Sequence, residues 1–132
     1  MRTIKFRARA FEKQWGYGIE KGDWVYGHYF VESIDIEDNI TFQTQYFIKM
    51  LYGDHYVNIR IDKETLGQFT GLFDKNGKEV YEYMEIDNIY EVSFKMECYI
   101  LTNISSGDII ALYNYMENKN GQVEITREYT KV

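Results

Sequence analysis

Few residues of this chain could perform chemistry, and their spacing matches no recognisable catalytic or metal-binding pattern. His28 and His55 lie 27 positions apart, and neither has a Cys or His neighbour at the spacing of a zinc site. His28 lies among aromatic residues, which predicts a packed histidine. The single cysteine, Cys98, falls on the apolar face of an alternating segment, which predicts a buried and unreactive thiol. We therefore expect no enzymatic activity, no bound metal and no cofactor.

Two acidic segments have some of the features of calcium loops. Asp35, Glu37 and Asp38 could supply carboxylate ligands, but the sixth position of an EF-hand pattern that starts at Asp35 is Ile40 instead of glycine. A solvated acidic loop is the interpretation that we favour there. The second segment, residues 74–77, reads Asp-Lys-Asn-Gly, and it predicts a hairpin turn because Asn and Gly both tolerate positive φ.

Charge distribution gives the first candidate binding residues. The net charge is −6, yet residues 1–13 carry five basic groups and one acidic group. An acidic protein is not expected to bind phosphate backbones broadly. A local basic face remains open: Arg7 and Arg9, with Trp24 or Tyr26 as stacking groups, would suit a nucleic acid. In the alternative interpretation, which we favour, the basic residues form the solvated face of a first strand.

The elements that must position these residues are predominantly strands. Aromatic residues together with Ile, Val and Thr make up 53 of the 132 residues, and these types favour β-structure. Hydrophobic periodicity predicts strands and helical turns along most of the chain. They are a strand over 4–10 with its Lys and Arg side chains facing water, a buried strand over 24–31, an acidic loop over 32–39, strands over 40–48 and 56–61, a helical turn over 62–65, one long strand over 90–101, a short helix over 113–118 and a last strand over 123–129.

A long block in the middle of the chain carries a family resemblance. Residues 66–82 read LGQFTGLFDKNGKEVYE, and they follow an opening MRTIKFRA and the stretch WVYGHY at 24–29. These three blocks, in this order, resemble the YopX family of small phage and prophage proteins. The matching central positions are Asp62, Glu64, Thr65, Gly67, Gln68, Phe69, Thr70, Gly71 and Leu72, then Asp74 to Glu79. The resemblance implies a mostly β fold and an origin in a mobile element, and it implies no activity. The C-terminal third departs from the family pattern.

Two interpretations of the central block are open. Gln68 and Thr70 would hydrogen-bond loop backbone that no strand ladder satisfies, while Phe69 and Leu72 anchor the loop in a core. Alternatively, a rigid loop presents Gln68 and Thr70 to a binding partner. We favour the first interpretation.

Together these observations predict a mostly β protein of short antiparallel strands in a small barrel- or sandwich-like domain, with at most one or two short helices. We expect residues 1–132 to form a single domain made of two packed β subassemblies, about 1–61 and 62–132. The function that we expect is a non-enzymatic interaction module of a phage or mobile element. Its expected partner is another protein, and a nucleic acid is the less favoured alternative. We expect a cytoplasmic location and no association with membranes, because the chain has neither a membrane span nor a signal peptide.

Overall fold

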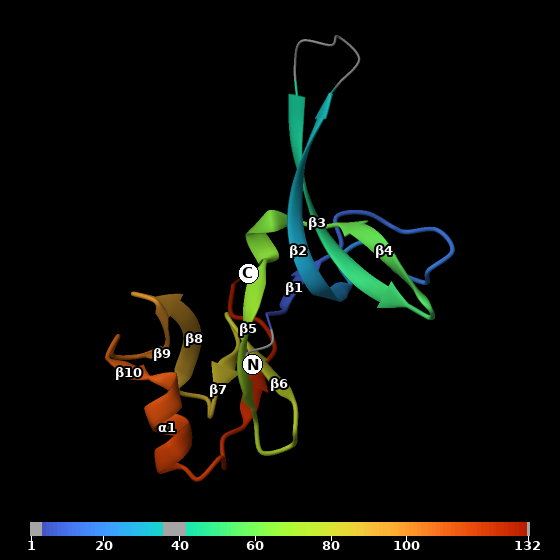
Figure 1. Ribbon diagram of the computed structural model, residues 1–132. Coiled ribbons are helices and arrows are strands. Elements are labelled where there is room, and N and C mark those ends of the chain that lie inside the picture. The colour runs from blue at the N-terminus through green and yellow to red at the C-terminus, as the bar shows by residue number, and fades with distance from the viewer. Residues whose placement is uncertain (1–3, 36–41, 132) are drawn as a thin grey trace. The chain divides into compact units, whose positions relative to one another are not determined.

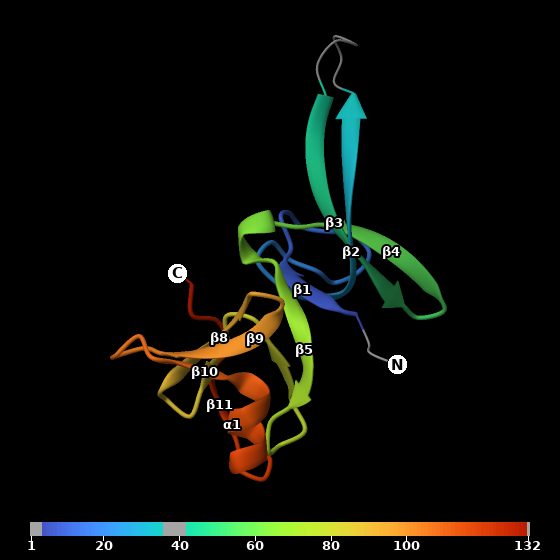
Figure 2. The same ribbon diagram turned by 60° about the vertical axis from the view of Figure 1, so that its left-hand side comes forward.

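The computed structural model describes residues 4–35 and 42–131, and most of its regular structure is antiparallel strand (Figure 1 and Figure 2). It contains one short α-helix and no closed barrel within these residues. The mostly β class predicted from the sequence is therefore confirmed, and the sandwich-like architecture fits better than the barrel. The chain divides into two compact units, residues 4–67 and 68–132. That the two pack together remains a prediction.

The N-terminal unit is built from four antiparallel strands in the order β4-β3-β2-β1. Their bounds are β1 (Phe6–Arg9), β2 (Trp24–Asp35), β3 (Phe42–Tyr52) and β4 (His55–Arg60), followed by a 3₁₀ turn, η1 (Lys63–Thr65). Small and β-branched residues fill the core, and β-branched side chains fit a pleated, half-buried surface. The buried core consists of Ala8, Ala10, Ile19, Val25, Ile48, Val57, Ile59 and Ile61. The helical turn predicted over 62–65 is confirmed, and the Asp62 side chain caps it by accepting a hydrogen bond from the Glu64 N–H.

Gly27 allows β2 and β3 to approach each other closely. A Cβ atom at this position would lie 2.1 Å from the backbone oxygen of Lys49. No side chain fits in that space, so the sheet requires glycine here.

The C-terminal unit contains a hairpin and a five-stranded sheet. The hairpin pairs β5 (Gly67–Phe73) with β6 (Glu79–Tyr81), and the sheet order is β10-β9-β8-β7-β11. The sheet strands are β7 (Glu85–Ile86), β8 (Tyr90–Lys95), β9 (Cys98–Asn103), β10 (Ile109–Ala111) and β11 (Ile125–Arg127), and the predicted helix is present as α1 (Leu112–Asn118). Apolar side chains from the hairpin, the sheet and the helix share one core, so two layers pack within this unit. That core is Phe69, Val80, Tyr81, Met84, Ile86, Val92, Leu101, Leu112, Tyr115, Met116 and Val123.

The long strand predicted over 90–101 is wrong, because the chain reverses in its middle. Lys95 pairs with Cys98 in the β8–β9 hairpin, and Met96 and Glu97 occupy the turn with φ of 52° and 63°. Neither residue is a usual turn former, since positive φ is uncommon outside Gly, Asn and Asp. The reversal exposes Cys98, so the prediction of a buried thiol is also wrong.

The buried strand predicted over 24–31 is wrong in its burial and in its length. Of these residues only Val25 is buried, and His28 is exposed instead of packed. The strand continues to Asp35, through the first half of the segment predicted as an acidic loop. The rest of that loop, Ile40 and the candidate calcium ligands Glu37 and Asp38 lie outside the described residues.

Candidate functional site

The four candidate residues of the N-terminal unit are brought together on β1 and β2. Arg7 pairs with Tyr26 and Arg9 pairs with Trp24 in the antiparallel register. The guanidinium carbons of Arg7 and Arg9 lie 4.1 and 4.5 Å from the centre of the Trp24 ring. Arg9 also donates a hydrogen bond to the Gly22 carbonyl. The cluster is a cation–π arrangement within the protein.

Burial limits what this cluster can bind. Arg7 is fully buried, which corrects the prediction that it faces water. The three-carbon stem of an arginine packs well on apolar surface, so alternation alone does not place its head in solvent. Trp24 is half-buried and already carries two guanidinium groups over its ring, whereas Tyr26 is 39% exposed. Stacking of a base on Trp24 would therefore compete with internal contacts.

Gln68 and Thr70 lie in the C-terminal unit, on strand β5 instead of a loop. The Thr70 hydroxyl is buried, donates to the Val80 carbonyl at 2.8 Å and accepts from the Leu72 N–H at 3.2 Å. The hydrogen bonds of Gln68 are made by its backbone, whose N–H donates to the Glu82 carboxylate at 2.8 Å. Thr70 thus stabilises the hairpin, and the Gln68 side chain is half-buried.

Ionisable groups in the C-terminal unit are perturbed by internal contacts. Burial alone would raise the pKa of Asp74, but hydrogen bonds from the Lys78, Ile125 and Asn76 N–H groups outweigh it and hold that pKa below its usual value. Burial raises the pKa of Tyr115, whose hydroxyl donates to Asp87 at 2.8 Å. Both carboxylates also accept backbone N–H groups from the segment around β11, so their evident role is to hold this unit together.

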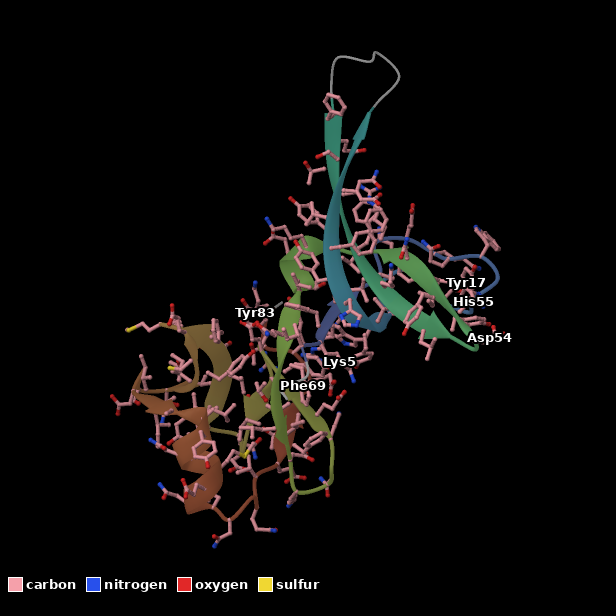
Figure 3. All side chains as sticks on the ribbon, viewed as in Figure 1. Lys5, Tyr17, Asp54, His55, Phe69 and Tyr83 are labelled. Atoms are coloured by element: carbon pink, nitrogen blue, oxygen red, sulfur yellow. The ribbon has the colours of Figure 1, made fainter. Side chains whose placement is uncertain are left out.

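The two histidines lie on exposed parts of the N-terminal unit. His55 begins β4, and its Nδ1 lies 3.2 Å from an oxygen of the neighbouring Asp54 (Figure 3). Its ring contacts Tyr52 edge-on, and Tyr52 in turn contacts Tyr17. This arrangement is a surface cluster of aromatic rings beside the β3–β4 turn.

A feature that the sequence analysis did not identify is a long two-stranded arm. Pairing with β1 ends at Gly27, and the β4 ladder ends at Phe47 of β3, yet β2 and β3 remain paired with each other out to Asp35 and Phe42. We call residues 28–35 and 42–46 the arm; Figure 1 shows it extending past β1 and β4. Period-two alternation over 42–48 was visible in the sequence, but the point at which neighbouring strands stop was not.

The arm combines exposed apolar side chains with negative charge. Val31 is 47% exposed and Phe42 is 64% exposed, and the Phe30 and Phe47 rings stack with centroids 5.2 Å apart. Glu32 is exposed, and the sequence contains no Lys or Arg between residues 24 and 48. Such a surface suits a partner with apolar and cationic groups.

A hollow of about 360 Å³ lies at the base of the arm. The guanidinium of Arg60 lies 3.9 Å from the Phe11 ring centre, and the Lys63 ammonium lies 4.9 Å from that of Tyr46. The full lining is Phe11, Thr44, Gln45, Tyr46, Arg60, Ile61, Asp62, Lys63 and Glu64. A second hollow of about 220 Å³ shares Phe11 and Asp62 with it and adds Arg9 and Lys21. No spacing in the sequence pointed to this set, because three separate segments form it.

Comparison with known proteins identifies the family. The family model described as YopX protein matches residues 5–127. The chain belongs to the YopX family. The resemblance read from the three sequence blocks is thereby confirmed, and the match extends through the C-terminal third. No curated protein and no solved structure gives a significant match.

Among the residues that the structure describes, no helix is long and apolar enough to cross a bilayer.

Proposed function

We propose that this YopX family protein is a non-enzymatic binding module whose partner is another protein. In this proposal it acts in the cytoplasm of a host cell, during the life of a phage or other mobile element. The single observation that carries the proposal is the arm: a ribbon of two strands that continues after both neighbouring strands have ended.

The outer edge of β2 is the part of the arm that we assign to the partner. Beyond Gly27 this edge has no ladder partner among the described residues, so the main-chain N–H and C=O groups that face it, those of alternate residues from Tyr29 to Asp35, are open to an added strand. Strand addition obtains affinity from main-chain hydrogen bonds and specificity from alternate side chains. Exposed Val31 and Glu32 would supply that specificity.

The charge of the arm favours a protein over a nucleic acid. The exposed Glu32 carboxylate, in a segment with no Lys or Arg between residues 24 and 48, repels phosphate and attracts cationic side chains. The cationic groups around the hollow, Arg60 and Lys63, are the specific observation that favours a nucleic acid instead. They share the hollow with Asp62 and Glu64, so the positive charge there is offset.

Site-specific photocrosslinking tests the proposal. A benzoylphenylalanine is placed at Val31 on the arm, or at the similarly exposed Tyr56 on β4 as a matched control, and each protein is irradiated in a host lysate. We expect a discrete protein adduct from position 31 that is absent from position 56, resists nuclease, and disappears when Glu32→Lys is added.

Two results would overturn the proposal. Equal adducts from both positions would show that the arm is not the binding element. Capture of nucleic acid that falls with added salt and is lost in Arg60→Ala plus Lys63→Ala would establish the alternative function.

A further inference from the structure

The hollow at the base of the arm is framed by two chain segments that main-chain hydrogen bonds tie together. The Phe11 N–H donates to the Arg60 carbonyl at 2.9 Å, and the Asp62 N–H donates to the Arg9 carbonyl at 2.9 Å. An antiparallel bridge lies between these two bonds. The backbone therefore holds the two segments side by side, and it fixes the positions from which their side chains reach the hollow.

Two cationic side chains of the hollow have aromatic rings as partners and no carboxylate. The guanidinium of Arg60 lies over the Phe11 ring, and the ammonium of Lys63 lies over the Tyr46 ring, at 3.9 and 4.9 Å from the ring centres. Among the described residues, no acidic group lies within ion-pair distance of either cation. A ring face orients a cation without neutralising it. Both positive charges are therefore available to an anion.

The two carboxylates of the lining limit the size of the anion. Asp62 and Glu64 are exposed, and with the two cations they bring the formal charge of the lining to zero. A polyanion that lies across the whole surface therefore gains little from this charge. A single anionic group that contacts both cations directly gains the most, because charge-assisted hydrogen bonds act at short range. The hollow thus suits a small anion.

The charge of the two cations matches a phosphate monoester better than a carboxylate or a phosphodiester. A phosphate monoester carries a charge of about −1.5 to −2 at neutral pH and offers three strong acceptor oxygens. A carboxylate or a phosphodiester carries a single negative charge. The guanidinium fork of Arg60 can bind two phosphate oxygens at once, and the Lys63 ammonium adds a point charge beside it.

The smaller hollow offers a place for a flat ring that carries an amino group. It has a volume of about 220 Å³ and shares Phe11 and Asp62 with the larger hollow, but Arg60 does not line it. Phe11 is 43% exposed, so its ring is accessible to a stacked group. Asp62 accepts the Glu64 N–H with Oδ1, and its Oδ2 accepts no hydrogen bond in the described part of the chain. A nucleobase supplies both the flat ring and the amino donor.

From these observations we propose that the two hollows together bind a nucleoside monophosphate. The phosphate contacts Arg60 and Lys63, and the base stacks on Phe11 and donates to Asp62. The inference goes beyond the binding function proposed above and does not depend on it, because the outer edge of β2 takes no part. It assigns recognition of a small molecule and no reaction.

Titration of the full chain followed by amide NMR chemical shifts tests the assignment. Adenosine 5′-monophosphate carries both groups, ribose 5-phosphate lacks the base, and adenosine 3′,5′-cyclic monophosphate keeps the base but is a diester of lower charge. We expect one molecule of adenosine 5′-monophosphate to bind each chain with a Kd below about 1 mM. Each of the other two probes should bind at least about tenfold more weakly.

Variants separate the phosphate contacts from the base contact. Arg60→Gln and Lys63→Gln should each weaken binding of adenosine 5′-monophosphate at least about tenfold. Lys49→Gln is the matched control, because the Lys49 ammonium also lies over an aromatic ring, 5.9 Å from the centre of Phe30, but lines neither hollow. Phe11→Leu should weaken binding of adenosine 5′-monophosphate and leave that of ribose 5-phosphate unchanged, which a misfolded variant would not do.

Four results would overturn the inference. They are a Kd above about 1 mM for adenosine 5′-monophosphate, shift changes centred outside residues 9–11, 21–22, 44–46 and 60–64, equal affinities of Arg60→Gln and Lys49→Gln, and equal affinities of ribose 5-phosphate and adenosine 5′-monophosphate. Displacement of the nucleotide by a single-stranded oligonucleotide that binds more tightly, with a steep salt dependence, would replace the inference with a nucleic-acid surface.

Discussion

Removing the Asp74 carboxylate is expected to be among the most damaging single changes outside the apolar core. Its Oδ1 accepts hydrogen bonds from the Asn76 and Lys78 N–H groups, both at 2.9 Å, and its Oδ2 accepts one from the Ile125 N–H at 3.2 Å. It therefore closes the β5–β6 turn and ties that turn to β11. The side chain is buried, so solvent replaces it only in part.

The loss of unfolding free energy in Asp74→Ala depends on whether water can replace the carboxylate as acceptor for each of the three N–H groups. Hydrogen bonds to a charged acceptor contribute about 1.5–3 kcal/mol each, and an N–H left buried and unpaired costs about 1–3 kcal/mol. Asn76 and Lys78 are exposed, so water can accept hydrogen bonds from their N–H groups, whereas Ile125 is half-buried. We expect Asp74→Ala to lower the free energy of unfolding by about 3 kcal/mol, which is a fall in Tm of about 10 °C for a chain of this size.

The Asp74→Asn variant isolates the contribution of the negative charge, because an amide has nearly the same shape as a carboxylate. The amide keeps one acceptor oxygen but turns an NH₂ group toward an N–H donor, so we expect a loss of about 1–2 kcal/mol. Because the folded state holds the pKa of Asp74 below its unfolded value, its stabilising effect is complete above the unfolded pKa and is lost as the pH falls through the folded pKa. The Asn variant should lack this part of the acid dependence.

Thermal unfolding followed by circular dichroism between neutral and acidic pH measures both effects. Asp54→Asn is the matched control, because the Asp54 side chain is fully exposed in the β3–β4 turn. A Tm for Asp74→Ala within about one degree of wild type would refute the reasoning. So would an Asn variant that retains the full acid dependence of the wild type.

Three further expectations concern the two units. Thr70→Val should lower the free energy of unfolding by about 1–3 kcal/mol because it leaves two backbone groups unpaired, while Gln68→Ala should change it by less than about 0.5 kcal/mol; chemical denaturation compares them. Cys98 should react with a thiol reagent in the native protein as fast as in the unfolded chain, and slow native labelling would contradict its exposure. Gly27→Ala should cost about 1–3 kcal/mol or prevent folding, since its Cβ would meet the Lys49 oxygen at 2.1 Å; an unchanged denaturation midpoint would count against this close approach.

Local patterns in the sequence predicted the elements that local chemistry controls. The turn at Asn76-Gly77, the capped turn after Asp62 and the helix near Tyr113 each depend on residues within one turn of the chain. The reversal at Met96-Glu97 could not be read in the same way. Both halves of that hairpin continue one period-two pattern, and no turn-forming residue interrupts it.

The candidate site was harder to predict because its properties depend on where neighbouring strands end. Alternation placed Arg7 on a polar face, but Arg7 is fully buried with its guanidinium over the Trp24 ring. The arm exists because β1 and β4 are shorter than β2 and β3, with which they pair. The length of a strand relative to its neighbour cannot be predicted from the sequence of either strand alone.

The residues that identify the family serve mainly to build the fold. Asp62 caps η1, Thr65 accepts the Arg9 N–H and donates to Asp62, Thr70 bridges the β5–β6 hairpin, and Asp74 closes its turn. A side chain whose hydrogen-bonding groups are all used internally has little left to offer a partner. The arm lies largely outside these motif blocks and leaves its edges open. Family membership therefore specifies the architecture. Under the binding function that we propose, recognition of the partner depends on segments such as the arm, where we expect variants to alter binding with little effect on stability.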